Sequence, residues 1–102
     1  MMHISVGTQG PSPEEYLLVL GLFGEEIRRA LNEAEARWRP LLLGEYDLGP
    51  GGSLRRRAYL LFRRDEEEVE MALLVGDAPE TRSEEEEMDE EAEALAEEWN
   101  AA

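Results

Sequence analysis

The fold of this chain is decided by one long periodic stretch, Ser12 to Arg39, which reads SPEEYLLVLGLFGEEIRRALNEAEARWR. Its opening residues suit a helix start: Ser12 can cap free backbone amides, the proline after it has a preset φ angle, and Glu15 can complete a capping box. Pro40 ends the stretch, because a proline disfavours helical geometry at the residue before it. The sequence therefore predicts one helix over residues 13–39.

This predicted helix has an apolar stripe. Side chains recur at the three-and-four spacing of one helical face, namely Tyr16, Leu20, Phe23, Ile27, Leu31, Ala34 and Trp38. The first half is also apolar off this stripe, at Leu17, Leu18, Val19 and Leu22. A helix that is apolar on every side is normally buried on every side. A chain of 102 residues is small to surround it, so we predict that another protein chain contacts Leu17, Leu18, Leu22 and Phe23. The alternative is that the sheet and the last helix cover these residues.

A sheet is expected over about residues 41–75. The Leu-rich residues 41–48 suggest a strand, and residues 49–53, GPGGS, have the composition of a loop. Residues 54–63 and 68–75 predict a β-hairpin. Placing Arg63 opposite Glu68 puts Ala58, Leu60 and Phe62 across from Leu73, Met71 and Val69. One face of this hairpin is then apolar and the other is mixed, with opposite charges paired.

The last segment predicts an acidic helix over about residues 84–100. Ser83 and Glu86 have capping-box spacing before it, and a narrow apolar stripe follows at Met88, Ala92, Leu95 and Trp99. We therefore expect a single α+β domain, residues 1–102. In it, the long N-terminal helix and the acidic C-terminal helix pack on a three-stranded antiparallel sheet. The sheet has four strands if residues 3–6 join it.

Charge is distributed unevenly along the chain, whose net charge is -15. Residues 1–64 carry nine Arg and eight acidic residues, whereas residues 65–102 carry one Arg and seventeen acidic residues. Such a chain is repelled by nucleic acid and by anionic membranes, so we expect neither as a direct partner. All ten cationic side chains are Arg, which fits a GC-rich genome, and the scarcity of Asn, Gln and Cys fits a thermophilic source.

No catalytic, cofactor or metal site is predicted. The turn Gly7-Thr8-Gln9-Gly10 matches neither the dinucleotide fingerprint nor the phosphate loop. His3 is the only histidine and has no announced partners. The acidic run 84–91 lacks a shaped loop that would make its oxygens converge on a cation. Nothing marks a pair of carboxylates for acid–base work, so we expect no enzyme activity and no small-molecule substrate.

An arginine cluster on the predicted hairpin has two interpretations. Arg55, Arg57 and Arg63 alternate onto the mixed face beside Tyr59. One interpretation is a nucleic-acid patch with Tyr59 as a stacking platform. The other, which we prefer because of the surrounding acidic charge, is that these side chains pair with carboxylates of residues 66–70 or of the last helix. Those carboxylates can belong to the same chain or to a neighbour.

These features together predict a non-catalytic interaction or assembly protein, self-associating or a small component of a larger complex or phage particle. The alternative is an acidic inhibitor, immunity protein or nucleic-acid mimic that covers a basic site on a target. The predicted partner-binding residues are Leu17, Leu18, Leu22, Phe23, Arg55, Arg57, Arg63, Glu85, Glu91 and Glu98. Without a membrane span or a secretory signal, we expect residence in the cytoplasm, or in a virion if the chain is phage-encoded.

Overall fold

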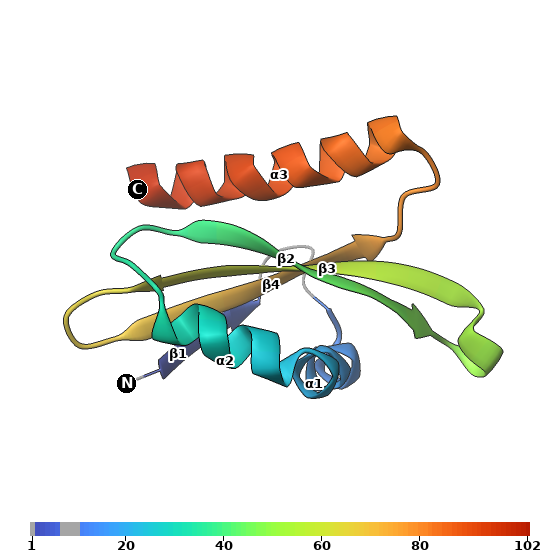
Figure 1. Ribbon diagram of the computed structural model, residues 1–102, viewed down its shortest axis with the longest axis horizontal. Helices are drawn as coiled ribbons and strands as arrows, with labels where there is room; N and C mark the ends of the chain where they lie inside the picture. The colour runs from blue at the N-terminus through green and yellow to red at the C-terminus, as the bar shows by residue number, and fades with distance from the viewer. Residues whose placement is uncertain (1, 7–10) are drawn as a thin grey trace.

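A computed structural model describes the backbone of residues 2–6 and all of residues 11–102. The elements in chain order are β1 (Met2–Val6), α1 (Pro13–Leu22), α2 (Gly24–Asn32), β2 (Arg39–Leu48), the short 3-10 helix η1 (Pro50–Gly52), β3 (Leu54–Arg64), β4 (Val69–Asp77) and α3 (Arg82–Ala101). The strands form one sheet in the order β1-β4-β3-β2. Helices α1 and α2 cover one face of this sheet and α3 covers the other (Figure 1).

The α+β class is confirmed, and residues 2–6 do add a fourth strand. The sheet is not wholly antiparallel, however, because β1 pairs parallel to β4, with Met2 opposite Val69. The other two pairings are antiparallel. Strand β2 lies at the opposite edge from β1 and starts slightly earlier than predicted, at Arg39. Pro40 is tolerated within β2 because an edge strand has one side that does not need to donate to a neighbouring strand.

The single helix predicted over residues 13–39 is wrong. Helix α1 ends at Leu22, Phe23 leaves helical geometry with φ -116° and ψ 22°, and α2 begins at Gly24. Two glycines near the break, Gly21 and Gly24, already weaken a continuous helix. The break lets the ring of Phe23 pack on β2 at Gly44, where an added Cβ would lie 2.9 Å from the ring.

Helix α2 also ends earlier than predicted. Its last residue is Asn32, and the guanidinium of Arg64 donates to the free carbonyl of Leu31 at 2.8 Å. Residues 33–38 then lead to the start of β2. Trp38, which the periodicity had placed on the helical stripe, instead packs on the α3 side of the sheet against Trp99, at 4.7 Å between ring centroids. Trp38 therefore matches the spacing of the predicted helical stripe only by coincidence.

The β-hairpin forms, but its predicted register is shifted by two residues. Arg63 lies opposite Glu70, and Arg64 lies opposite Val69. The turn therefore comprises residues 65–68, and it is closed by Asp65, whose carboxylate accepts from the amides of Glu67 at 3.0 Å and Glu68 at 2.7 Å. Because side chains alternate with a period of two, a shift of two residues leaves each one on its predicted face.

Both faces of the sheet are buried, in two separate clusters. Ala58, Leu60 and Phe62 of β3 pack with Met71, Leu73 and Val75 of β4 beneath α1 and α2. On the other face, Tyr59, Leu61 and Leu74 pack against Ala92 and Ala96 of α3. The central strand β3 thus contributes to both clusters, which explains its long apolar run.

Helix α3 begins two residues before the predicted start at residue 84. The capping residue is Thr81, whose hydroxyl accepts from the amide of Glu84 at 3.2 Å, and not Ser83. The carboxylate of Glu84 accepts from the amide of Glu80 at 3.0 Å. At the other end, the side chain of Asn100 binds both the amide and the carbonyl of Trp38, at 2.6 and 3.0 Å, so the helix is tied to the start of β2.

Candidate protein-interaction surfaces

The outer side of α1 exposes three large apolar side chains. Leu17 is 67% exposed, Leu18 36% and Leu22 52%. Val19, between them in the sequence, is fully buried, because Glu15 and Val19 are one helical turn apart on the side that faces the sheet. Three of the four off-stripe residues are therefore not covered by the sheet, and α3 lies on the opposite face (Figure 1). We call Leu17, Leu18 and Leu22 the α1 patch.

Phe23 is not part of that patch. Its ring is half-buried against the core and meets the ring of Tyr46 edge-on, at 6.2 Å and 68°. The sequence placed it among the partner-binding residues, whereas the structure gives it contacts within its own chain that form the corner between α1 and α2.

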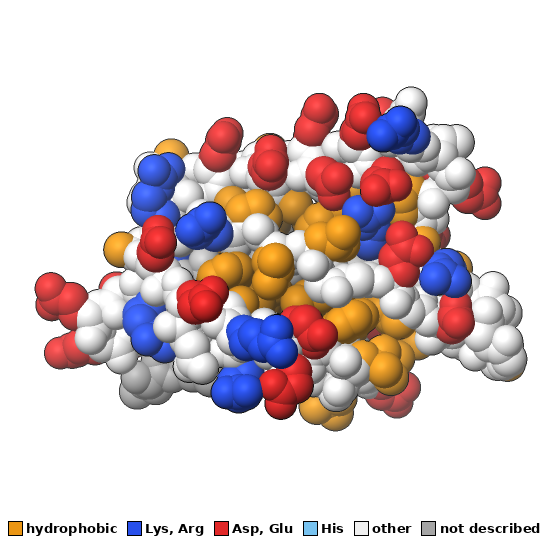
Figure 2. Space-filling view, viewed as in Figure 1, with side chains coloured by type: hydrophobic (Ala, Val, Ile, Leu, Met, Phe, Trp, Pro, Cys, Tyr) orange, Lys and Arg blue, Asp and Glu red, His pale blue; other side chains and the backbone are white. Residues whose placement is uncertain are grey.

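A second exposed apolar region follows the edge strand β2. Leu41 is 37% exposed and Leu42 is 44% exposed. In the space-filling view, hydrophobic side chains gather along this edge of the sheet, between α3 and the two N-terminal helices (Figure 2). The sequence pattern of residues 41–48 predicts a strand but no partner-binding role for it. The sequence signal for this region is the apolar run Leu41-Leu42-Leu43, which indicates an exposed edge only once β2 is known to pair with β3 alone among the described strands.

The predicted arginine cluster is paired within the chain. Arg55 contacts Glu45 at 2.9 Å and Asp47 at 3.9 Å. Arg63 pairs with Glu70, and its guanidinium lies 5.6 Å from the centre of the Trp38 ring. Arg55 and Arg63 therefore form ion pairs with carboxylates of the same chain.

Arg57 is the most buried of these arginines, with its side chain 3% exposed. It lies among three carboxylates, those of Asp89 at 3.4 Å, Glu85 at 3.5 Å and Glu45 at 3.7 Å. Since Asp89 and Glu85 belong to α3, this cluster fixes the first half of α3 on the sheet. The buried Nε of Arg57 has no hydrogen-bond partner in the described part of the chain.

Tyr59 cannot serve as a stacking platform, because it is buried at 3% exposure beneath α3. Its hydroxyl donates to the carboxylate of Asp89. Burial and this hydrogen bond together raise the pKa of Tyr59 above its usual range. The geometry assigns Tyr59 to the contact between helix and sheet.

Glu15 is buried and joins three elements, whereas its position in the sequence predicts only a helix cap. The cap at Ser12 does form, through the amide of Glu15 at 3.2 Å. The carboxylate of Glu15, however, accepts from the hydroxyl of Tyr46 at 2.8 Å and from the guanidinium of Arg56 at 2.9 and 3.1 Å. Arg56 also donates to Asp77 at 2.8 Å. The available signal was the position of Glu15, one turn before Val19 on a buried side.

Burial opposes the ionisation of Glu15 and is the largest single influence on its pKa. Hydrogen bonds from Arg56 and Tyr46, with the charge of Arg56, outweigh burial and hold the pKa of Glu15 below its usual value. Burial and the same carboxylate raise the pKa of Tyr46 beyond its ordinary range. These three side chains therefore form a charged structural tie among α1, β2 and β3.

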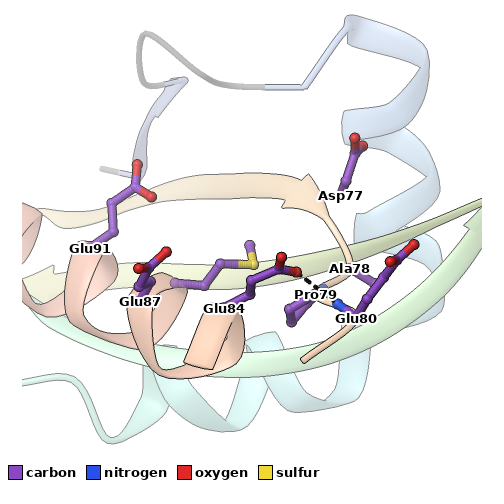
Figure 3. Close-up of a pocket in the computed structure, with 8 residues that line it drawn as sticks. Asp77, Ala78, Pro79, Glu80, Glu84, Glu87 and Glu91 are labelled. Carbon is purple, nitrogen blue, oxygen red and sulfur yellow. Dashed lines mark hydrogen bonds between the residues drawn. The ribbon is translucent and has the colours of Figure 1, made fainter. Parts of the chain in front are cut away.

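The acidic residues predicted to bind a partner lie along exposed parts of α3. Glu85 is near Arg57, while Glu98 is exposed near the C-terminal end. Glu91 lines a hollow of about 360 Å³ with Glu84, Glu87, Met88 and residues 77–80. In Figure 3 the labelled carboxylates of this hollow are spread apart and do not converge on one point. It is an open acidic depression at the end of β4.

No group of three or more His, Cys, Asp or Glu residues with the geometry of a metal site occurs among the described residues. The side chain of His3 and the turn Gly7–Gly10 lie outside the described residues. No helix in the described ranges has the length and apolar character needed to cross a bilayer. The chain matches no protein-family model, no curated protein and no solved structure.

Proposed function

We propose that this chain is a non-catalytic interaction or assembly protein that associates with copies of itself or is a small structural component of a larger complex, including a phage particle. The observation that carries the proposal is the exposure of the α1 patch: Leu17, Leu18 and Leu22 lie in solvent on a helix whose other side packs on the sheet. Grouped exposed apolar side chains on a soluble domain mark contact sites.

Light scattering tests the proposal. We expect a mass above that of one chain, 11.6 kDa, and a fall in that mass when Leu18→Gln and Leu22→Gln are combined. Both side chains project from α1 into solvent, so the double variant should keep its fold. The matched control is Leu54→Gln, which changes a side chain of similar exposure, 41%, at the start of β3.

The outcomes are distinct. A monomeric wild-type chain at high concentration and at high salt would contradict self-association. A mass that falls equally in the Leu54→Gln control would show that the α1 patch is not the contact.

The second candidate is an acidic inhibitor that covers a basic site on a target protein, and one observation favours it. Helix α3 exposes glutamates that have no ion-pair partner among the described residues, including Glu86, Glu90, Glu93 and Glu97. This function predicts a monomer whose binding weakens steeply with salt and with Glu→Gln changes in α3. The salt dependence of target binding separates it from assembly through the apolar α1 patch.

A further inference from the structure

Strand β2 is an open edge with little protection. Within the described residues it pairs on one side only, with β3, over Arg39 to Leu48. An open edge presents unpaired backbone amides and carbonyls to any extended segment that comes alongside. Natural edges are commonly interrupted by Pro or a bulge; here Pro40 and the irregularity between Leu42 and Gly44 flank the exposed leucines, and the regular backbone of the edge runs from Gly44 to Leu48.

Side chains on this edge favour a partner that brings apolar groups. Leu41 and Leu42 are both partly exposed, at 37% and 44%. Alternation along β2 places them on opposite faces, since Leu41 lies opposite Leu60 and Leu42 lies opposite Tyr59. A strand added beside β2 would therefore lie next to one partly exposed leucine on each face of the sheet.

Helix α3 places a row of acidic residues, Glu86, Glu93 and Glu97, above the same edge; we call this row the acidic wall. The rotation of α3 is fixed at two points, where Asp89 contacts Arg57 and Asn100 binds the backbone of Trp38. Helical spacing then puts a row of exposed residues on the same side of α3 as those two contacts, namely Glu86, Glu93 and Glu97. Figure 2 shows acidic side chains along α3, bordering the hydrophobic edge of the sheet.

This arrangement disfavours a second copy at the edge. Two β2 strands paired antiparallel about a two-fold axis keep both α3 helices on the same face of the joined sheet. The two acidic walls would then face each other, in a chain whose net charge is already -15. Like charges brought together across an interface oppose association.

We propose that the β2 edge binds, by strand addition, an extended segment of another protein in which apolar residues alternate with Arg or Lys. The backbone of the segment pairs with β2, its basic side chains point toward Glu86, Glu93 and Glu97, and its apolar side chains lie on the α1–α2 side of the sheet. Main-chain pairing supplies affinity in this binding mode, and alternate side chains supply specificity. The inference rests on the proposed function as an interaction protein and names the class of partner.

A synthetic peptide provides the probe: a fluorescein-labelled segment of alternating Val and Lys, with fluorescence anisotropy read at physiological salt. Its control has the same sequence with every backbone amide N-methylated, which keeps the charge and the apolar side chains but removes the donors of ladder hydrogen bonds at both edges of the peptide. We expect the control peptide to bind at least about tenfold more weakly, a difference of about 1.4 kcal/mol.

Two protein variants of equal charge test the acidic wall. Glu86→Gln/Glu93→Gln/Glu97→Gln neutralises the side of α3 above β2, and we expect it to weaken peptide binding about tenfold. Glu87→Gln/Glu91→Gln/Glu98→Gln neutralises three exposed glutamates on the side toward β4 and should leave binding nearly unchanged. All six residues are exposed, so circular dichroism should show unchanged folding.

The remaining outcomes are decisive. If both triple variants weaken peptide binding equally, or if the N-methylated peptide binds as tightly as the unmodified one, binding is nonspecific attraction between opposite charges. Either result would overturn the inference. Loss of self-association on Leu42→Lys would show that a second copy occupies the edge, which also overturns it. If the chain self-associates through α1 but binds no peptide, the proposed function stands without this partner. If a monomeric chain binds the peptide specifically, peptide binding at the β2 edge is supported and the proposal of self-association is wrong.

Discussion

At the scale of single residues, Glu15 shows how one position can serve two purposes. Its backbone amide is used by the Ser12 cap, while its carboxylate, 5% exposed, joins Tyr46 and Arg56. Burying a charge is costly unless it is paired and hydrogen-bonded. Glu15 meets that condition with three hydrogen bonds, so it ties α1 to two strands that lie far from it in the sequence.

Replacing this carboxylate should destabilise the fold. We expect Glu15→Gln to lower the free energy of unfolding by about 3 kcal/mol near neutral pH, the scale for breaking a buried charge pair. Denaturant unfolding followed by circular dichroism measures it. Tyr46→Phe, which removes a single hydrogen bond, is the comparison and should cost about 1 kcal/mol.

The same variant should show a defined pH dependence. The pKa of Glu15 is lowered in the folded chain, so its contribution is fully present above its unfolded value, 4.5, and is lost as pH falls through the folded pKa. The difference in free energy of unfolding between the wild type and Glu15→Gln should therefore shrink as pH falls through that window. A difference that stays constant well below it would contradict a role for the ionised carboxylate.

At the scale of elements, the break between α1 and α2 and the bulge in β2 belong together. Gly44 has φ +149°, a region that favours glycine, and Phe23 occupies the space where a Cβ would be. The corner between the helices therefore fits a gap in the facing strand. The contact between Gly44 and Phe23 could not be predicted from the sequence, because the two residues meet only in the folded chain.

Alanine at two glycines should have opposite effects. Gly44→Ala should destabilise the fold by about 2 kcal/mol, since the new Cβ collides with the Phe23 ring and the backbone angle is unfavourable. Gly21→Ala is the matched control: nothing lies within 4 Å of an added Cβ in α1, so it should stabilise by about 0.5–1 kcal/mol. Thermal unfolding of both variants checks the signs, and a stable Gly44→Ala chain would contradict the close packing.

Elements with local signals were predictable from sequence, and their ends were less so. The apolar alternation of β3 and β4 fixed which side chains share a face, and the Ser12 cap was correct. The predicted hairpin register was wrong by two residues, because the contacts of the Asp65 carboxylate set the turn and apolar alternation does not reveal them. The long helix failed because its stripe continues in phase across Phe23, where the chain bends. Glu15 and the β2 edge depend on which strands are neighbours, information that periodicity does not contain.

At the scale of the whole molecule, charge is arranged by layer. Helix α3 carries most of the unpaired glutamates on one face of the sheet, whereas the buried or half-buried arginines of β3 lie within the molecule. The contacts of Arg57 to Glu85 and Asp89 join these layers. Repulsion among the remaining acidic residues opposes compact folding.

Salt should therefore stabilise the fold. We expect the melting temperature to rise by several degrees as NaCl increases from about 10 mM to about 500 mM, because the Debye length falls below the spacing of the surface charges. Glu86→Gln/Glu93→Gln/Glu97→Gln should reduce that dependence. A melting temperature that falls with salt would mean that surface ion pairs outweigh the repulsion.

The parallel pairing of β1 with β4 has a consequence for synthesis. Strand β1 is made before β4, yet Met2 has its place beside Val69, at the start of β4. Until β4 has emerged from the ribosome, β1 has no docking position in this sheet, because β4 is the strand beside it. Strand β1 therefore precedes the other three strands in the chain but must wait for β4, and its pairing is a long-range step that local contacts cannot hasten.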